Sequence, residues 1–337
     1  MLDPIKFKLQ QRSHRLQVLP IIIVYLNNVC DSRCVTCSIW KNNEALKIPA
    51  ERQMSGELLE ELYQNLGKWH PRQILLSGGE PALHPSFAEA VRKFRDIAGK
   101  VCVISNGLAL SSCGSRALQG VSEFYISFDG HDRESYRRIR GVDGFERLAS
   151  TLEILNTLRR RPKIVARCTL QKANVRRLPQ LVEAARAMGF DCISFLGADL
   201  GSPAFARDLH GPADAEAIQP DGEDLLEMTD ALRGLDYSDG FVEGGVERLN
   251  RIAQYFRALR GEGELPAVSC NAPWMSMVIE TTGRMRGCFF QPVIGDFRTV
   301  NEEAALSFRR NLNVSTDATC ERCVCSRSLG VAEFLRM

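Results

Sequence analysis

The chain has 337 residues, 45% of them hydrophobic, which is enough for one large domain and a small second one. Its formal net charge is +2 at pH 7, so the composition does not support nucleic-acid binding, which usually needs a strongly basic surface. No apolar stretch approaches eighteen residues, and residues 1–15 lack the apolar core of a secretory signal. We therefore expect a cytoplasmic protein that does not cross a membrane.

Strand-like and helical patterns alternate after an N-terminal arm at 1–19. This alternation is typical of an α/β fold with a parallel sheet. The apolar runs that predict strands are 21–26, 72–77, 101–104, 123–128, 164–170 and 191–196. The periodic stretches that predict helices between them are 56–68, 86–98, 146–160 and 175–188.

The pattern changes after the sixth strand. Residues 198–222 are rich in glycine and proline, which predicts a loop, and we expect it to act as a lid over a substrate. His210 lies in this loop, where a lone histidine is usually only solvated. Helical patterns at 222–234 and 245–260 follow, so we divide the chain into a main domain at 20–235, a helical linker at 236–264 and a small domain at 265–337.

Twelve cysteines are many for a chain without a secretory signal, and in a reducing compartment they indicate metal ligands more often than disulfides. Three crowd the loop after the first strand, and five lie in the last seventy residues. We expect the remaining four cysteines to pack in the core, because free cysteine commonly behaves as a small buried hydrophobic residue. They are Cys102, Cys113, Cys168 and Cys192.

The first group is Cys30, Cys34 and Cys37, with the spacing C-x3-C-x2-C. Three thiolates are one short of a structural zinc site or an ordinary cubane cluster, each of which takes four ligands. The triplet therefore predicts a [4Fe–4S] cluster with one iron open to a further ligand.

This triplet resembles the radical S-adenosylmethionine (radical SAM) superfamily. The turn Gly78-Gly79-Glu80-Pro81 after the second strand resembles the Gly-Gly-Glu-Pro turn of that superfamily, whose backbone holds the amino group of SAM. Glycines there let a ligand approach the backbone closely. The resemblance implies a partial (β/α)6 TIM-like barrel with its active face at the carboxyl ends of the strands.

The resemblance also implies further SAM contacts at strand ends. Ser127 lies in a Ser-Phe-Asp-Gly segment whose serine contacts SAM in relatives, and Asn106 follows the third strand. We assign Arg140 to the SAM carboxylate and Arg167 as the second choice, because a guanidinium fork suits a carboxylate. Thr36 stands where many relatives carry an aromatic residue that packs the adenine.

The C-terminal cysteines resemble the SPASM and twitch domains of one branch of this superfamily. The pattern Cys270-x12-Gly283-x4-Cys288 matches the opening of such a domain, with a β-hairpin around the glycine, and a helical stretch at 301–311 precedes the last cysteines. Five cysteines fit one auxiliary [4Fe–4S] cluster, the twitch arrangement, rather than two. We assign the ligands as Cys270, Cys288, Cys320 and Cys323, with Cys325 spare or exchanged with Cys323; a zinc ion on the same four thiolates is the alternative.

The resemblance implies an enzyme that cleaves SAM reductively to a 5′-deoxyadenosyl radical and abstracts a hydrogen atom from its substrate. We expect a small sugar- or cyclitol-like metabolite, net oxidation or epimerisation, and an electron donor such as flavodoxin or ferredoxin. For epimerisation the candidate hydrogen-atom donors are the thiols of Cys168, Cys192 and Cys325. Because only 29 residues precede Cys30, a peptide-recognition domain does not fit there, so peptide modification or cofactor maturation is the alternative. A non-catalytic zinc-binding interaction protein is the alternative from another class.

Overall fold

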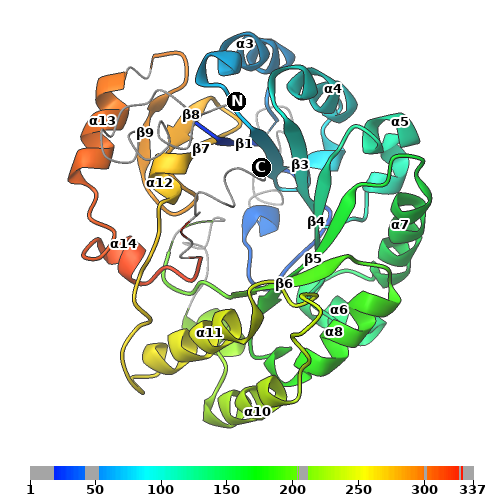
Figure 1. Ribbon diagram of the computed structural model, residues 1–337, viewed down its shortest axis with the longest axis vertical. Helices are drawn as coiled ribbons and strands as arrows, with labels where there is room; N and C mark the ends of the chain where they lie inside the picture. The colour runs from blue at the N-terminus through cyan, green and yellow to red at the C-terminus, as the bar shows by residue number, and fades with distance from the viewer. Residues whose placement is uncertain are drawn as a thin grey trace.

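Residues 19–41, 53–202, 204, 212–299, 302–325 and 328 are described by the computed structural model. They form an α/β structure in which six parallel strands curve into a partial barrel with helices on its outer side (Figure 1). The parallel strands are β1 (Ile21–Asn27), β2 (Gln73–Gly78), β3 (Lys100–Ser105), β4 (Glu123–Ser127), β5 (Lys163–Leu170) and β6 (Cys192–Gly197). The six predicted strands are thus confirmed to within one or two residues at each end.

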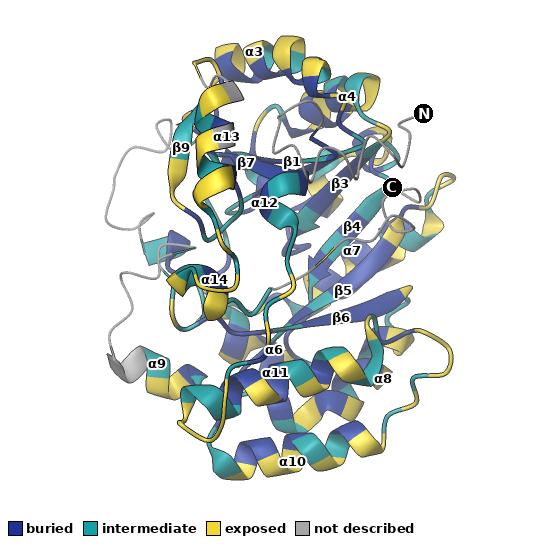
Figure 2. Ribbon diagram, turned by 60° about the vertical axis from the view of Figure 1, so that its left-hand side comes forward, coloured by how far each residue is buried: buried dark blue, intermediate teal, exposed yellow. Residues whose placement is uncertain are grey.

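Helices connect these strands and cover the outer face of the sheet, where their solvent sides are exposed and the strands are buried (Figure 2). The predicted helices are confirmed as α3 (Gly56–Leu66), α4 (Phe87–Ile97), α7 (Phe145–Thr157), α8 (Leu178–Ala187), α10 (Gly222–Arg233), α11 (Gly245–Leu259) and α13 (Glu302–Asn311). Shorter helices that the sequence patterns did not predict are α5 (Ser115–Leu118), α6 (Arg133–Arg140), α9 (Pro212–Ile218), α12 (Ala272–Met275) and α14 (Ala318–Glu321). Single 3₁₀ turns are η2 (Gly67–Trp69), η3 (Pro81–Leu83), η4 (Leu110–Cys113) and η5 (Val175–Arg177).

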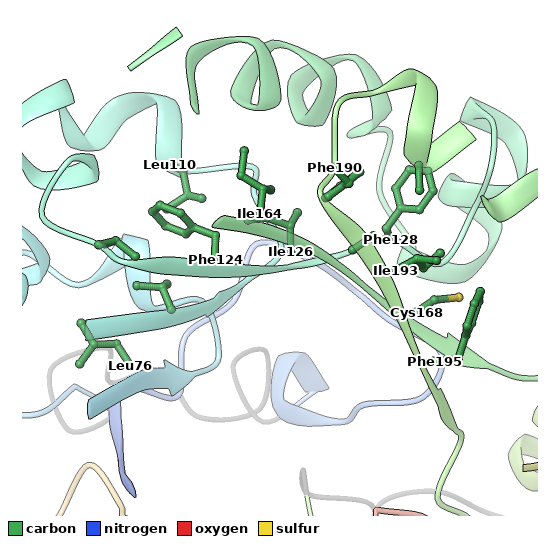
Figure 3. Close-up of a cluster of buried hydrophobic side chains, with 14 of the residues drawn as sticks. Leu76, Leu110, Phe124, Ile126, Phe128, Ile164, Cys168, Phe190, Ile193 and Phe195 are labelled. Carbon is green, nitrogen blue, oxygen red and sulfur yellow. The ribbon is translucent and has the colours of Figure 1, made fainter. Parts of the chain in front are cut away.

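The side chains on the two faces of the parallel strands have different surroundings. Alternate residues such as Val24, Phe124 and Phe195 point outward and pack with the helices into the main hydrophobic core, part of which Figure 3 shows. The residues between them face the inside of the barrel. On the β1–β4 side these form a smaller apolar cluster that includes Ile23, Leu75 and Tyr25.

The C-terminal strands extend the barrel sheet instead of forming a separate one. β7 (Ser276–Ile279) pairs in parallel with β1, and Ile23 lies opposite Val278. β8 (Arg284–Arg286) and β9 (Val293–Asp296) follow in antiparallel order, so the sheet runs β6-β5-β4-β3-β2-β1-β7-β8-β9. The predicted hairpin around Gly283 therefore begins with a strand that is hydrogen-bonded to the barrel.

The loop predicted as a lid at 198–222 is described except for 203 and 205–211, so His210 lies outside the described residues, and part of the predicted loop is the helix α9. Ile218 at the end of that helix accepts a hydrogen bond from the backbone N–H of Lys172 (2.8 Å). The role as a lid stays a prediction. None of the described helices combines the length and the apolar character that a membrane span requires.

Candidate functional site

The cysteine loop follows β1 at the carboxyl edge of the sheet. Cys34 is buried, and Cys30 and Cys37 are half-buried. Cys34 lies within electrostatic range of both other thiols, so the structure brings the predicted triplet together. Burial raises the pKa of Cys34 to about 12, and therefore metal binding must displace the thiol proton.

Helix α6 holds this loop with its last carbonyl groups. The backbone N–H of Arg33 donates to the carbonyl of Arg140 (2.9 Å), and that of Val35 donates to the carbonyl of Ile139 (3.1 Å). The helix ends at Gly141 with φ of 70°, and a Cβ there would lie 2.3 Å from the Arg33 carbonyl oxygen. Glycine thus permits the helix end and the cysteine loop to touch.

Asn106 fastens the loop from the end of β3. Its buried side-chain NH2 group donates to Asp31 Oδ1 (2.6 Å) and Ser32 Oγ (2.9 Å), and it lies 3.8 Å from Cys30 Sγ. Its Oδ1 accepts from the backbone N–H of Leu108 (2.8 Å). The structure therefore places this predicted SAM contact against the protein, where it orients the first cysteine.

The glycine turn after β2 packs directly on the chain that leads into the cysteines. The N–H of Gly79 donates to the carbonyl of Asn27 (2.7 Å), and that of Glu80 donates to the carbonyl of Val29 (2.7 Å). A Cβ on Gly78 would lie 2.1 Å from the Asn27 oxygen, and one on Gly79 would lie 2.2 Å from the Val29 oxygen. The close approach of the two backbone segments requires glycine at both positions, whether or not a ligand also binds there.

The carboxylate of Glu80 lies wholly inside this arrangement. Oε1 accepts from the hydroxyl of Ser105 (2.8 Å) and the N–H of Ala82 (3.0 Å), and Oε2 accepts from the N–H of Asn106 (2.7 Å). Burial raises the pKa of Glu80 to about 7, although these donors oppose the rise. Glu80 therefore joins the ends of β2 and β3 through its carboxyl group, and its role as a SAM contact stays a prediction.

This raised pKa predicts that stability depends on pH. Folded Glu80 holds its proton up to about pH 7, whereas the unfolded group loses it near pH 4.5. The contribution of Glu80 to the free energy of unfolding is therefore complete below pH 4.5 and disappears as the pH rises through 7. Urea unfolding of the cluster-free chain should show a loss of roughly 2–3 kcal/mol between pH 5 and 8 from this group. Glu80→Gln should be less stable overall but lack this slope; identical pH profiles for the two proteins would contradict it.

The two candidate arginines have different surroundings. Arg140 is half-buried, and its Nη1 pairs with Asp129 Oδ2 (2.9 Å), whose other oxygen accepts from the N–H of Thr169 (2.6 Å). Arg167 points to the inside of the barrel and donates from Nη1 to Ser194 Oγ (2.9 Å). Ser127 lies opposite Arg167 in the sheet register.

Ser127, Arg167 and Ser194 thus form one polar row across β4, β5 and β6, on the inner face. The opposite part of the inner face is apolar and aromatic. Tyr25 contacts Phe289, with ring centroids 5.9 Å apart, and Tyr125 belongs to the same cluster. The barrel interior therefore offers hydrogen-bond donors on one side and aromatic surface on the other.

The C-terminal cysteines also come together. Cys288 lies within electrostatic range of Cys270, Cys320, Cys323 and Cys325, and Cys323 is in range of Cys270 as well. The side-chain NH2 group of Gln291 donates to Cys320 Sγ (3.2 Å). The choice between Cys323 and Cys325 as fourth ligand stays a prediction.

Tyr25 connects the two cysteine groups in space. Its electrostatic neighbours include Cys37 of the first group and Cys288 of the second, together with Glu280 and Arg286. Burial raises the pKa of its phenol, so Tyr25 stays protonated. The two groups therefore border the same end of the barrel.

The candidate hydrogen-atom donors are scattered. Cys168 points outward into the hydrophobic core, where Figure 3 labels it and where Asn174 Nδ2 lies 3.7 Å from its sulfur. Cys192 faces inward but begins β6, so it lies at the opposite end of that strand from the cysteine loop. Cys325 lies with the other C-terminal cysteines. The structure thus does not bring Cys168 or Cys192 to the site.

Two observations test whether these residues fit an iron–sulfur cluster. Within the described part of the chain, five buried side-chain N or O atoms have no hydrogen-bond partner, and three of them border the cysteine loop: Ser38 Oγ, Tyr136 Oη and Arg140 Nε. No three His, Cys, Asp or Glu side chains of the described residues converge on one ion position. Because each cysteine of a cubane binds a different iron, its ligands are spaced more widely than those of a single zinc ion. The cysteine loop fits a cluster whose surroundings supply polar donors.

Several residues of the site were not singled out by the sequence patterns. Asp129 stood in the quoted Ser-Phe-Asp-Gly segment, but its partner Arg140 is eleven residues away on a helix that was not predicted. Tyr136 lies on the same helix. The signal for α6 was present in Asp132 and Ser135, which form a capping box, and in Gly141.

Residues 24–185 match the model of the radical SAM superfamily. A probable GTP 3′,8-cyclase of Thermoplasma volcanium is 25% identical over 164 residues, which are 48% of this chain and 49% of the relative. The Fe-coproporphyrin III synthase of Methanosarcina barkeri is 28% identical over 178 residues, 51% of this chain and 43% of the relative. The chain thus spans half the length of these relatives or less.

Solved structures resemble the chain over nearly its whole length. Streptococcus suis SuiB bound to precursor peptide SuiA has a TM-score of 0.62 over 97% of this chain and 75% of its own, at 14% identity. Native anSMEcpe with bound AdoMet has a TM-score of 0.62 over 91% of this chain and 88% of its own, at 15% identity. At these identities the likeness concerns the fold.

Proposed function

Because the chain belongs to the radical SAM superfamily, we propose that it cleaves SAM reductively and abstracts a hydrogen atom from an organic substrate held inside the barrel. When bound, the [4Fe–4S] cluster and SAM supply that chemistry. The observation that carries the proposal is the meeting of the cysteine triplet, the glycine turn and Asn106 at one edge of the sheet.

The protein's part in this reaction is to orient and enclose. Cys30, Cys34 and Cys37 hold the cluster, and α6 and Asn106 fix the loop that carries them. The carbonyl groups at the Gly78–Gly79 turn lie at the edge where the amino group of SAM would be received. The inner face of the barrel is partly buried, and a substrate bound there would be shielded from part of the solvent, which protects a reactive site from side reactions.

We propose Arg167, rather than our first choice Arg140, for the SAM carboxylate. Arg140 packs against Asp129 and pairs with it, whereas Arg167 lies on the inner face beside Ser127 and Ser194. Removing a charged donor from a carboxylate usually costs about 1.5–3 kcal/mol, or roughly 10- to 100-fold in affinity.

Arg167→Ala should therefore weaken SAM binding about 10- to 100-fold, measured by equilibrium dialysis of the reconstituted protein under anaerobic conditions. Arg257→Ala is the matched control, because Arg257 also donates to a hydroxyl, that of Thr229 (2.8 Å), but on the outer helices. Unchanged SAM affinity in Arg167→Ala would assign the carboxylate to another residue.

We further propose that the C-terminal cysteines hold an auxiliary [4Fe–4S] cluster that accepts or tunes electrons for the site. Support comes from the grouping of the five thiols and from Tyr25, which lies in range of both cysteine groups. A one-electron carrier such as flavodoxin or ferredoxin would supply the reducing electron.

For the substrate we propose a small polar metabolite, with a sugar- or cyclitol-like compound as the first class to test. The polar row of Ser127, Arg167 and Ser194 facing an aromatic side supports this choice, and the curated relatives are named for small molecules. A peptide is the second candidate, because one of the structures with the same fold was solved with its precursor peptide.

The test is an anaerobic assay of the reconstituted, dithionite-reduced protein with SAM and either candidate metabolites or peptides. Substrate-dependent formation of 5′-deoxyadenosine is the expected result, with deuterium transferred from the labelled C–H bond of the substrate. Stimulation by peptides alone would replace the metabolite proposal, and absence of 5′-deoxyadenosine with every substrate and reductant would contradict the proposed function.

A further inference from the structure

Helix α6 carries two polar atoms that lack a partner directly beside the cysteine loop. Tyr136 is fully buried, and its hydroxyl has no hydrogen-bond partner. Arg140 uses Nη1 for Asp129, but its Nε–H is buried without a partner. The two residues are four apart and therefore lie on the same face of the helix.

An unpartnered buried donor is costly, at about 1–3 kcal/mol for each group. Tyr136 contacts Phe145 edge to face, with ring centroids 5.8 Å apart, so a phenylalanine would keep this packing without the unpaired hydroxyl. The hydroxyl thus needs an acceptor that the polypeptide does not provide. The same holds for the Nε–H of Arg140.

One acceptor in electrostatic range of both donors is the sulfur of Cys34. Cys34 is an electrostatic neighbour of both Tyr136 and Arg140, and the carbonyl groups of Ile139 and Arg140 anchor the loop on either side of Cys34. The helix therefore holds its two donors and the cysteine loop as one unit. A thiolate bound to iron, or a sulfide of the cluster, accepts such hydrogen bonds.

We propose that Tyr136 Oη–H and Arg140 Nε–H donate hydrogen bonds to sulfur at the Cys34 corner of the cluster and raise its reduction potential. The inference rests on the proposed function and deepens it by naming two residues that tune the cluster. Reduction adds negative charge to the cluster, and donors to its sulfurs stabilise that charge. Tyr136 and Arg140 are positioning and tuning residues, because they act on the substrate only through the cluster.

The test is a redox titration, followed by EPR, of the reconstituted full chain and its Tyr136→Phe variant. We expect Tyr136→Phe to load the same iron and to show a lower potential, with about a tenfold smaller reduced-to-oxidised ratio at a fixed potential, or about 59 mV for one electron. Repeating the titration in a Cys288→Ala background assigns the signal to the N-terminal cluster. Arg140→Lys keeps the charge opposite Asp129 but removes the Nε–H, and it should shift the potential in the same direction.

Tyr237→Phe is the matched control, because the hydroxyl of Tyr237 already donates to the carbonyl of Leu232 (2.9 Å) away from the cysteine loop. It should leave the potential unchanged. An unchanged potential in Tyr136→Phe, or equal shifts in Tyr136→Phe and Tyr237→Phe, would overturn the inference.

The inference and the proposed function fail in different ways. SAM cleavage with no shift of potential in either variant overturns the inference alone. A shifted potential in a protein that never forms 5′-deoxyadenosine supports the inference and overturns the proposed function. A chain that binds no iron under anaerobic reconstitution overturns both.

Discussion

Replacing Cys34 with alanine should abolish the formation of 5′-deoxyadenosine. Cys34 is the most buried of the three thiols, and it lies in range of Cys30, Cys37 and the charged pair of Arg140 and Asp129. Two remaining thiolates cannot hold a cubane that already lacks its fourth protein ligand. Product analysis after anaerobic reconstitution, with iron and sulfide counts, measures the effect.

The matched control for this variant is Cys113→Ala. Cys113 is a half-buried thiol that lies near the carbonyl groups of Ala82 and Ala109 and belongs to neither cysteine group. It should retain the full iron content and cleave SAM. Undiminished 5′-deoxyadenosine in Cys34→Ala would remove the proposed mechanism.

Replacing Cys288 with alanine should remove roughly four irons and the coupled turnover of substrate, while some uncoupled SAM cleavage remains. Cys288 is the residue with the most cysteine neighbours in the C-terminal group, so its loss should dismantle that site alone. The N-terminal loop keeps its own supports, α6 and Asn106. Iron analysis beside a 5′-deoxyadenosine assay separates the two losses.

The companion variants are Cys323→Ala and Cys325→Ala. By our assignment Cys323→Ala loses the auxiliary irons and Cys325→Ala keeps them; the reverse result would exchange the two ligands. Wild-type protein should contain about eight irons and eight labile sulfides per chain, against two zinc ions for a zinc-binding interaction protein. Unchanged iron in Cys288→Ala would show that the C-terminal region is not a cluster domain.

The barrel strands could be predicted because two signals in the sequence agreed: the apolar runs that indicate strands and the helical periodicity of the segments between them. Runs such as 21–26 are apolar on both faces, as expected for strands covered on both sides, and helical periods separate the strands. The cysteine triplet and the glycine turn were predictable for a different reason. Each follows a strand directly, so their meeting at one edge needed only the parallel order of β1 and β2.

Long-range pairings could not be predicted from local patterns. Nothing in the run 276–279 indicates that β7 joins the barrel at β1, because partner choice depends on packing far away in sequence. Arg140 was assigned to SAM by residue type, but α6 places it against Asp129. That helix was missed because it is only eight residues long and five of these are charged, although its caps were visible.

The most direct test of the central claim is EPR spectroscopy of the reduced Cys288→Ala protein with and without SAM. In this variant we expect only the N-terminal cluster, whose fourth iron no side chain of the triplet can ligate. Addition of SAM should change the spectrum of that cluster, and Arg167→Ala should require more SAM for the same change. A spectrum that stays the same at saturating SAM would mean that the fourth iron is closed, and the account would be wrong.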